Sequence, residues 1–228
     1  IVGYAGRALT SGGRNVAIGH LALNQEDAHG KNVAIGFYAL QSQNAGTDAY
    51  NIAIGYDAGK SVTTGIANTI IGGLAGDSFT TGDANIAIGH SALSAEDEGN
   101  SSIAIGYQAL LNQNVNGEVH NVAIGRAAGK EITTGSLNTI MGGLAGGALT
   151  TGEKNIAIGY NALATEDTGD RSVAIGHGAL RYQNNDASNY NVAVGYDAGT
   201  NITTGAQNTI IGGLAGDALT VGDTNVAV

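Results

Sequence analysis

Short groups of aliphatic residues recur along the whole chain, and each group ends in a glycine, as in NVAIG at Asn15–Gly19. We number positions from this glycine, which is position 0. Positions −3 and −1 are mostly Val or Ile, and they share one face of an extended chain because side chains alternate. The pattern therefore predicts one short strand before each anchor glycine. The anchors are Gly19, Gly36, Gly55, Gly72, Gly89, Gly106, Gly125, Gly142, Gly159, Gly176, Gly195 and Gly212.

The spacing between successive anchor glycines follows a fixed order of 17, 19, 17 and 17, and this order then starts again. Four spacings make one long repeat. Three long repeats cover 1–70, 71–140 and 141–210, and a fourth begins at 211–228. A short fixed period is typical of solenoids, whose coils pack on their neighbours. The sequence therefore predicts one repeat domain over 1–228, an all-β parallel β-solenoid of about 13 coils of 17 or 19 residues. Each coil would have two short strands, in a rod on the order of 60 Å long.

Both faces of each predicted strand are apolar. Position −2, opposite −3 and −1, is Ala in nine repeats and Ile at Ile70, Ile140 and Ile210. A strand with two apolar faces is buried on both sides. We expect positions −3 and −1 to fill the core of the coil, and the small residue at −2 to meet a second chain. This pattern predicts an oligomer with position −2 at the subunit interface.

The rest of each repeat follows one of two patterns after a constant Ala at +3. Leu-type repeats have Leu at +4, as at Leu93, and then a polar loop. Gly-type repeats have Gly at +4 and a large apolar residue at +7, as at Phe79, usually followed by TTG, where we expect a tight turn with glycine at positive φ. Position −4 is Asn in most repeats. Stacked Asn amides bonded along the column and a turn-forming Asn in the left-handed conformation both explain it.

Composition limits the class of protein. The chain has 38 Gly, no Pro, Cys or Trp, 12% charged residues and a net charge of −10. It lacks the cysteines needed for disulfides, its negative charge argues against nucleic acid as a partner, and no apolar run is long enough to span a membrane. We interpret it as a segment of something longer.

The motifs resemble a known type of repeat. SVAIG at Ser172–Gly176, with NVAIG and NIAIG elsewhere, is similar to the head repeats of YadA-like trimeric autotransporter adhesins. The longer pattern with GYQAL, GYDAG and NTIIGG resembles repeats of bacteriophage tail-fibre proteins even more. The resemblance implies a left-handed β-roll, a side-by-side homotrimer forming a fibre, and attachment outside the cell, on a virion tail fibre or a bacterial surface.

No catalytic, cofactor or metal site is predicted. GGLAGD at Gly72–Asp77 differs in spacing and period from calcium-binding β-roll repeats. The His residues at +1 alternate with other residue types, which metal ligands would not do. The acidic pairs that begin with Glu26, Glu96 and Glu166 lie in polar loops, so we expect solvated turns and little loss of stability for Glu96→Ala.

The best candidates for surface contacts are outward aromatic residues at +1. Their rings either bind a partner, such as a host-cell receptor or glycan, or cover the neighbouring coil. The function predicted is a structural and adhesive segment, not an enzyme, that holds or forms a receptor-binding surface. The alternative is an ice-binding solenoid, although TTG is missing from two of every four repeats. The candidate contact residues are Phe37, Tyr56, Tyr107, Tyr160 and Tyr196.

Overall fold

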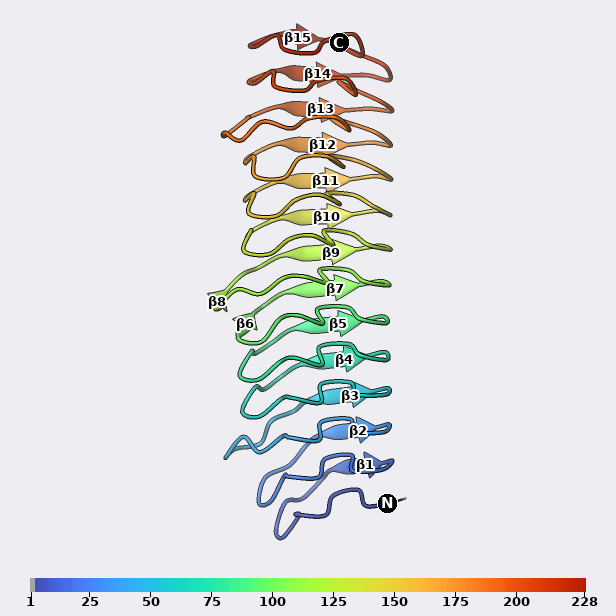
Figure 1. Cartoon of the computed structure of the whole chain (residues 1–228), viewed down its shortest axis with the longest axis vertical. Coiled ribbons are helices and arrows are strands. Elements are labelled where there is room, and N and C mark those ends of the chain that lie inside the picture. The colour runs from blue at the N-terminus through green and yellow to red at the C-terminus, as the bar shows by residue number, and fades with distance from the viewer. Residues whose placement is uncertain (1–2) are drawn as a thin grey trace. The chain divides into compact units, whose positions relative to one another are not determined.

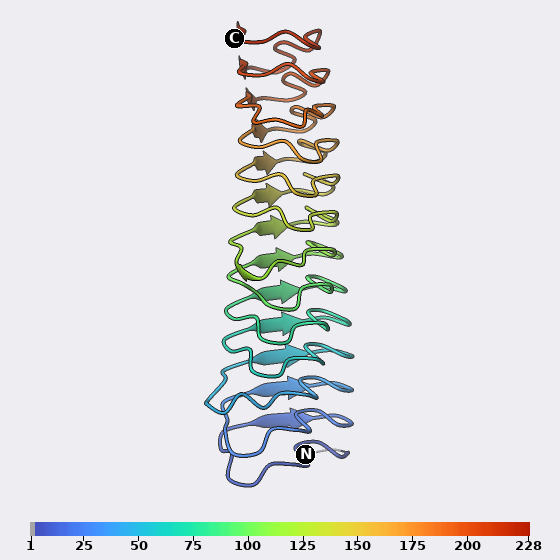
Figure 2. The same cartoon turned by 60° about the vertical axis from the view of Figure 1, so that its left-hand side comes forward.

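In the computed structural model, which describes residues 3–228, each repeat makes one turn of a parallel β-solenoid. The chain divides into two compact units, one ending at Val119 and one from His120 to Val228, which together hold about 12 turns of about 17 residues. Within each unit the strands stack one above the next, and the loops of each turn follow the same path (Figures 1 and 2). The described residues contain no helix, and so none that could cross a membrane. The fold class predicted from the sequence is confirmed as far as the parallel β-solenoid.

The first unit has one strand of three residues in each turn, and successive strands pair in parallel in the order β1-β2-β3-β4-β5-β7. Equivalent repeat positions face each other, as Ala53 and Ile70 do between β3 and β4. Two short loop strands, β6 and β8, form a separate pair. The strands are β1 (Val16–Ile18), β2 (Val33–Ile35), β3 (Ile52–Ile54), β4 (Thr69–Ile71), β5 (Ile86–Ile88), β6 (Gly99–Asn100), β7 (Ile103–Ile105) and β8 (Gly117–Glu118).

The second unit repeats this arrangement, with parallel pairing in the order β9-β10-β11-β12-β13-β14-β15. Its strands are β9 (Val122–Ile124), β10 (Thr139–Met141), β11 (Ile156–Ile158), β12 (Val173–Ile175), β13 (Val192–Val194), β14 (Thr209–Ile211) and β15 (Val226–Ala227). The expectation of two strands in every coil is wrong. The return path of each turn is built from turns and bends, with the β6–β8 pair and a single bridge from Asp170 to Ser188 as the described exceptions.

The inward face of each strand is the opposite of the one we expected. Position −2 points into the coil, and Ala53, Ile70 and Ala87 are completely buried. Positions −3 and −1 point outward, and Ile18 is 43% exposed. Size explains the difference: the interior also receives the Ala at +3 and a large residue from +4 or +7, which are buried after every anchor glycine but the last, where Ala215 and Leu219 are half-buried. Little room remains for the strand, so a methyl group fits in most turns.

The anchor glycines are required by close contact between turns. Gly72 has a φ of 136°, and a Cβ built on it would lie 2.6 Å from the carbonyl oxygen of Gly89. Gly65, which ends a TTG segment, has no positive φ, contrary to our expectation. A Cβ there would lie 2.5 Å from the oxygen of Gly82, so this glycine is required by space and not by φ.

The Asn residues at −4 form a ladder that joins successive turns. The Oδ1 atom of Asn51 accepts a hydrogen bond from the backbone N–H of Asn68 at 2.8 Å, and its Nδ2 donates to the Gly65 oxygen at 2.7 Å. The same pair of bonds recurs at Asn68. The residue before each Asn, such as Tyr50 with a φ of 57°, holds the left-handed conformation. The Asn side chains therefore do bond along the column, but mostly to the backbone N–H of the next ladder residue, with amide-to-amide bonds at Asn208 and Asn225. The left-handed Asn is wrong.

Candidate functional site

The outward face of the strands is an aliphatic surface that nothing covers within the described part of each unit. The side chains at −3 and −1 are half-buried against their neighbours above and below, or exposed, as at Ile52, Met141 and Ile211. The same two positions repeat in every turn of each unit. Soluble proteins rarely leave a contiguous apolar surface of this kind in water unless it binds something.

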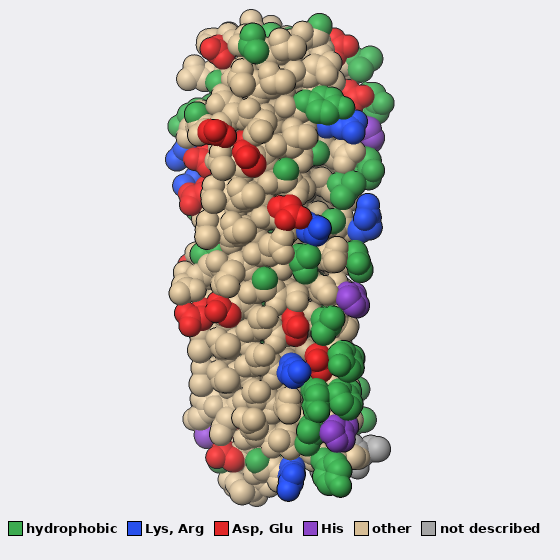
Figure 3. All heavy atoms as spheres, in the orientation of Figure 1, with side chains coloured by type: hydrophobic (Ala, Val, Ile, Leu, Met, Phe, Trp, Pro, Cys, Tyr) green, Lys and Arg blue, Asp and Glu red, His purple; other side chains and the backbone are tan. Residues whose placement is uncertain are grey.

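A column of exposed aromatic side chains runs along position +1. All five predicted contact residues lie on the surface, with exposures from 40% for Phe37 to 57% for Tyr56 and Tyr196. Their neighbours in the column are often histidines, and rings in successive turns stack nearly parallel. Figure 3 shows hydrophobic and histidine side chains gathered along the right-hand edge of that view in each unit.

Ring geometry shows which candidates the fold brings together. In the first unit Phe37 stacks between His20 and Tyr56, with centroids 5.1 and 5.5 Å away, and Tyr107 stacks on His90 at 5.7 Å. In the second unit His177 stacks between Tyr160 and Tyr196, at 5.6 and 5.2 Å. A stacked ring turns its face to its neighbour and its edge to solvent. These rings therefore cover the neighbouring coils and still leave about half of their area for a partner.

The column is interrupted where position +1 is glycine. Gly73 follows Tyr56, and a Cβ built on it would lie 3.6 Å from the His90 ring of the next turn. Gly143 lies in the same way beside Tyr160. The histidine and tyrosine rings thus pack over the glycine backbone at these two turns.

The acidic loop residues are not the solvated pairs we expected. Glu26, Glu96 and Glu166 are completely buried, whereas Asp27 is exposed and Asp97 is half-buried. The three glutamates occupy position +7, the position that holds a large apolar side chain in Gly-type repeats. Their shared position in each long repeat, together with a Gln at +7 of the next turn, was the sequence signal for burial.

The two deepest glutamates each accept several hydrogen bonds. Glu96 Oε1 accepts from the Gly99 N–H at 2.8 Å, and Oε2 accepts from Gln113 Nε2 at 2.8 Å. Glu166 has the equivalent bonds from Gly169 and Gln183, at 2.9 and 2.8 Å. Burial raises the pKa of both carboxyls above the ordinary value, and the N–H donors lower it only in part. Burial likewise raises the pKa of Glu26, against the N–H of His29.

One group of side chains among residues 3–228 has the composition of a small metal site. Oxygen atoms of Glu26 and Asp27 and a ring nitrogen of His29 lie within 4.8 Å of one another. Glu26 Oε1 accepts from the His29 N–H, and Asp27 Oδ1 from the Ala28 N–H, so both carboxylates serve the turn itself. The later long repeats do not preserve the histidine, since glycine stands at Gly99 and Gly169.

The threonines of the TTG segments bond to the next turn. Thr63 Oγ1 donates to the Thr80 carbonyl at 3.0 Å, and Thr133 Oγ1 donates to the Thr150 carbonyl at 3.2 Å. The second threonine of each pair, such as Thr64, is exposed. Half of the candidate ice-binding hydroxyls in these two segments therefore hold successive turns together.

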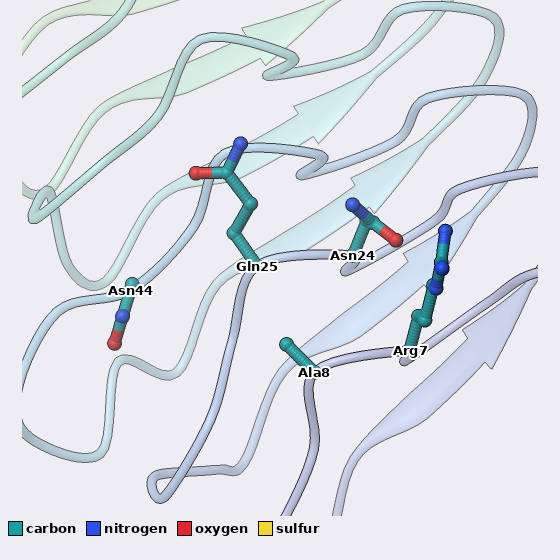
Figure 4. Close-up of a pocket in the computed structure, with 5 residues that line it drawn as sticks. All are labelled: Arg7, Ala8, Asn24, Gln25 and Asn44. Atoms are coloured by element: carbon teal, nitrogen blue, oxygen red, sulfur yellow. The ribbon is translucent and has the colours of Figure 1, made fainter.

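A surface cavity of about 440 Å³ lies in the first unit (Figure 4). It is lined by Arg7, Ala8, Asn24, Gln25 and Asn44, which come from three successive turns. Sequence reasoning did not identify it, because the loop residues at these positions differ between the long repeats.

Comparisons with known proteins identify no family, so the fold alone defines the class of this protein. No family model matches the chain, and neither a curated protein nor a solved structure matches it. The repeats and the architecture define a parallel β-solenoid repeat protein.

Proposed function

We propose that this chain is a structural and adhesive segment of a homotrimeric fibre that holds or forms a receptor-binding surface outside the cell. The observation that carries the proposal is the aliphatic outer face of the strands. Ile18 and Met141 show its exposure in the single chain, at 43% and 38%. Covering such a face is favourable by about 25 cal/mol for each Å² of apolar surface removed from water.

The period of this face favours another copy of the same chain as its partner. Position −1 is apolar in every turn, and position −3 is aliphatic except at Thr69, Thr139 and Thr209. A complementary surface therefore needs the same rise for each turn. A second copy has that rise by construction, and closed symmetric assemblies are the usual form of such contacts. The number three and the left-handed coil rest on the resemblance to adhesin heads and tail fibres. The interface would use positions −3 and −1, in place of the buried position −2.

The adhesive part of the proposal rests on the exposed aromatic column at position +1. Tyr107 and Tyr160 keep about half of their area in water while they stack on histidines. Aromatic edges with hydroxyl groups are frequent in protein contact surfaces. The ice-binding alternative has less support, because Thr63 and Thr133 donate their hydrogens to the next turn. Absence of thermal hysteresis in solutions of the purified chain would exclude it.

Light scattering of the purified chain tests the assembly. We expect a mass three times the chain mass of 22.7 kDa at micromolar concentration. The double variant Ile88→Glu, Ile158→Glu places charges on the outer face and should yield monomers. The double variant Thr64→Glu, Thr134→Glu, at exposed loop positions, should remain trimeric. Monomeric wild-type protein would contradict the proposal.

Binding of the labelled trimer to cells tests attachment. If this segment forms the contact surface, Tyr107→Ala with Tyr160→Ala should reduce binding while light scattering still shows a trimer. If it only spaces a distal tip, the variant should bind as the wild type does when that tip is present.

A further inference from the structure

The cavity in the first unit is lined by polar side chains that have no partner among the described residues. Arg7, Gln25 and Asn44 are exposed, and Asn24 is half-buried. None of these four side chains makes a hydrogen bond or ion pair with any residue that the structure describes, and the exposed Ala8 completes the lining. Asn24 Oδ1 is a buried acceptor without a donor. A buried polar atom of this kind needs an explanation, and a ligand that donates to it is one.

The backbone around the cavity is fixed, although its side chains are free. The Ala8 N–H donates to the Asn24 carbonyl at 3.2 Å, and the Gln25 N–H donates to the Gln41 carbonyl at 3.1 Å. The Asn44 N–H donates to the Thr63 carbonyl at 2.8 Å. Figure 4 shows Arg7 and Asn24 toward one end of the cavity and Asn44 toward the other. The backbone hydrogen bonds thus fix the loops from which the four polar side chains project.

The equivalent positions in the second long repeat do not form such a group. Asp77 stands in place of Arg7 and Ser94 in place of Asn24, and Ser94 Oγ donates to Asp77 Oδ1 at 2.6 Å. Those two side chains satisfy each other and carry a negative charge. The first long repeat departs from the second by gaining a guanidinium and an unpaired amide at one place.

We propose that this cavity binds a sugar ring that carries one anionic group. Among the described residues of the lining, the Arg7 guanidinium is the only charged group, and a guanidinium can pair with a carboxylate or phosphate in two parallel hydrogen bonds. The three amides each offer a donor and an acceptor, which suits hydroxyl groups that need both. The cavity is a surface depression that is open to solvent, and its volume of about 440 Å³ is within the range of about 300–1,000 Å³ of small-molecule sites. This inference deepens the proposed receptor-binding role and rests on it for its biological use.

Calorimetric titration with three sugars of the same ring tests the inference and separates the two anions. The ligands are methyl glucuronide, glucose 6-phosphate and neutral methyl glucoside. We expect one or both anionic sugars to bind, and the neutral sugar to bind about tenfold or more weakly. Binding should weaken as salt is raised, because the Arg7 pair is exposed to screening. Equal binding of all three sugars, or no binding of any, would overturn the proposal.

Variants locate the site. Arg7→Gln should weaken binding of the anionic sugar about tenfold or more, since it removes the charge. Adding Asn24→Ala to this variant should weaken binding further. Arg126→Gln, the same change at an exposed arginine outside the cavity, should have no effect. An unchanged affinity in Arg7→Gln would reject the site. Light scattering of the same samples shows whether the trimer is intact, so failure of sugar binding is distinguished from failure of the proposed assembly.

Discussion

Leu-type and Gly-type turns fill the same core by different means. In a Gly-type turn, Gly76 at +4 leaves space that Phe79 at +7 occupies. In a Leu-type turn, Leu93 at +4 fills that space, and +7 holds the buried Glu96. Both large residues are completely buried. The core therefore needs one large side chain in each turn, and the other position accepts glycine or a polar group.

The difference lies in what a polar residue at +7 requires. The carboxylate of Glu96 needs the Gly99 N–H and the Gln113 amide, and Gln113 also donates to Ser102 Oγ at 3.0 Å. Ser102 stands where most turns have the ladder Asn, and Ser172 does the same beside Glu166 and Gln183. In the second and third long repeats, glutamate, glutamine and serine of two adjacent Leu-type turns thus satisfy one another. In the first long repeat Asn32 takes the place of the serine and donates to Glu26 Oε2 at 3.4 Å, while Gln43 donates to the Thr63 carbonyl. Gly-type turns have no such dependence.

The largest effect should follow from separating a Leu-type pair. Deleting residues 89–105 joins Ile88 to Gly106 and places Gln113 over Phe79. Gln113 then loses the Glu96 and Ser102 oxygens that accept its hydrogen bonds. We expect a greater loss of stability, measured by denaturant unfolding, than any substitution below produces.

The control is deletion of residues 71–140, which is one complete long repeat. Leu149 then follows Val62 at +7, in the place of Phe79, and every turn keeps neighbours of its own type. Stability in repeat proteins depends mostly on nearest neighbours. This shorter chain should fold and unfold cooperatively, and an unfolded product would contradict the nearest-neighbour account.

Phe79→Ala should be the most harmful single change in a Gly-type turn. It empties the main core position of that turn, and Gly76 offers nothing to refill it. We expect a loss of about 3–5 kcal/mol in the free energy of unfolding. Leu93→Ala, at +4 of the next turn, should cost about 2–5 kcal/mol. A loss for Phe79→Ala below that of an exposed-residue variant would mean that the two turn types do not share one core.

Glu96→Ala should cost about 2–6 kcal/mol, because it leaves the Gly99 N–H and one N–H of the Gln113 amide without an acceptor in the core, at about 1–3 kcal/mol each. The exposed neighbour is the matched control, and Glu98→Ala should change stability by less than about 0.5 kcal/mol. Urea midpoints of the two variants give the comparison. Equal midpoints would mean that Glu96 is a solvated loop residue, as the sequence first indicated.

The smallest effect is a dependence on pH that only Leu-type turns produce. Burial raises the pKa of Glu96 and Glu166 in the folded chain above the ordinary value of 4.5. The folded state then holds protons that the unfolded state has lost. The stability that the raised pKa of these two carboxyls contributes should therefore be fully present below about pH 4.5. It should be lost as the pH rises through their raised pKa.

The double variant Glu96→Gln, Glu166→Gln should flatten this slope. Its absolute stability is a poor measure, because the new amides disturb Gln113 and Gln183. The slope of unfolding free energy against pH is the useful quantity. An identical slope in wild type and variant would show that these carboxyls do not titrate differently on folding.

The sequence was sufficient for the period, the strand positions and the parallel stacking, because Val, Ile and Gly recur at fixed distances. It was not sufficient for the inward face. Ile70 and Ile71 are both apolar, so alternation alone cannot say which one is buried. Residue size contains the answer, since the Ala at −2 fits an interior already occupied from +3, +4 and +7.

Other features were missed for different reasons. Glu96 looked like a loop residue because charge is a poor sign of burial, and only its position at +7 indicated the core. The left-handed residues occur at −5, +2 and +4, as at Arg14, Leu21 and Leu23 with φ of 62°, 55° and 50°, and the glycine at +4 of Gly-type turns has the same conformation. These positions vary in residue type, so tertiary contacts and not local preference impose their conformation. The predicted aromatic contacts are exposed, and their binding role stays a prediction.

The strand register has a consequence for the rate of folding. Each paired residue meets its equivalent 17 or 19 positions along the chain, as Val16 meets Val33 and Val33 meets Ile52. Sequence separation between contacts therefore stays constant however many turns are added, unlike in most β-proteins, where it grows with size. Chains with small separations cross lower entropic barriers. A turn that has closed offers its Asn oxygen and strand edge to the next, so we expect folding to spread from turn to turn while the remainder of the chain is still unfolded.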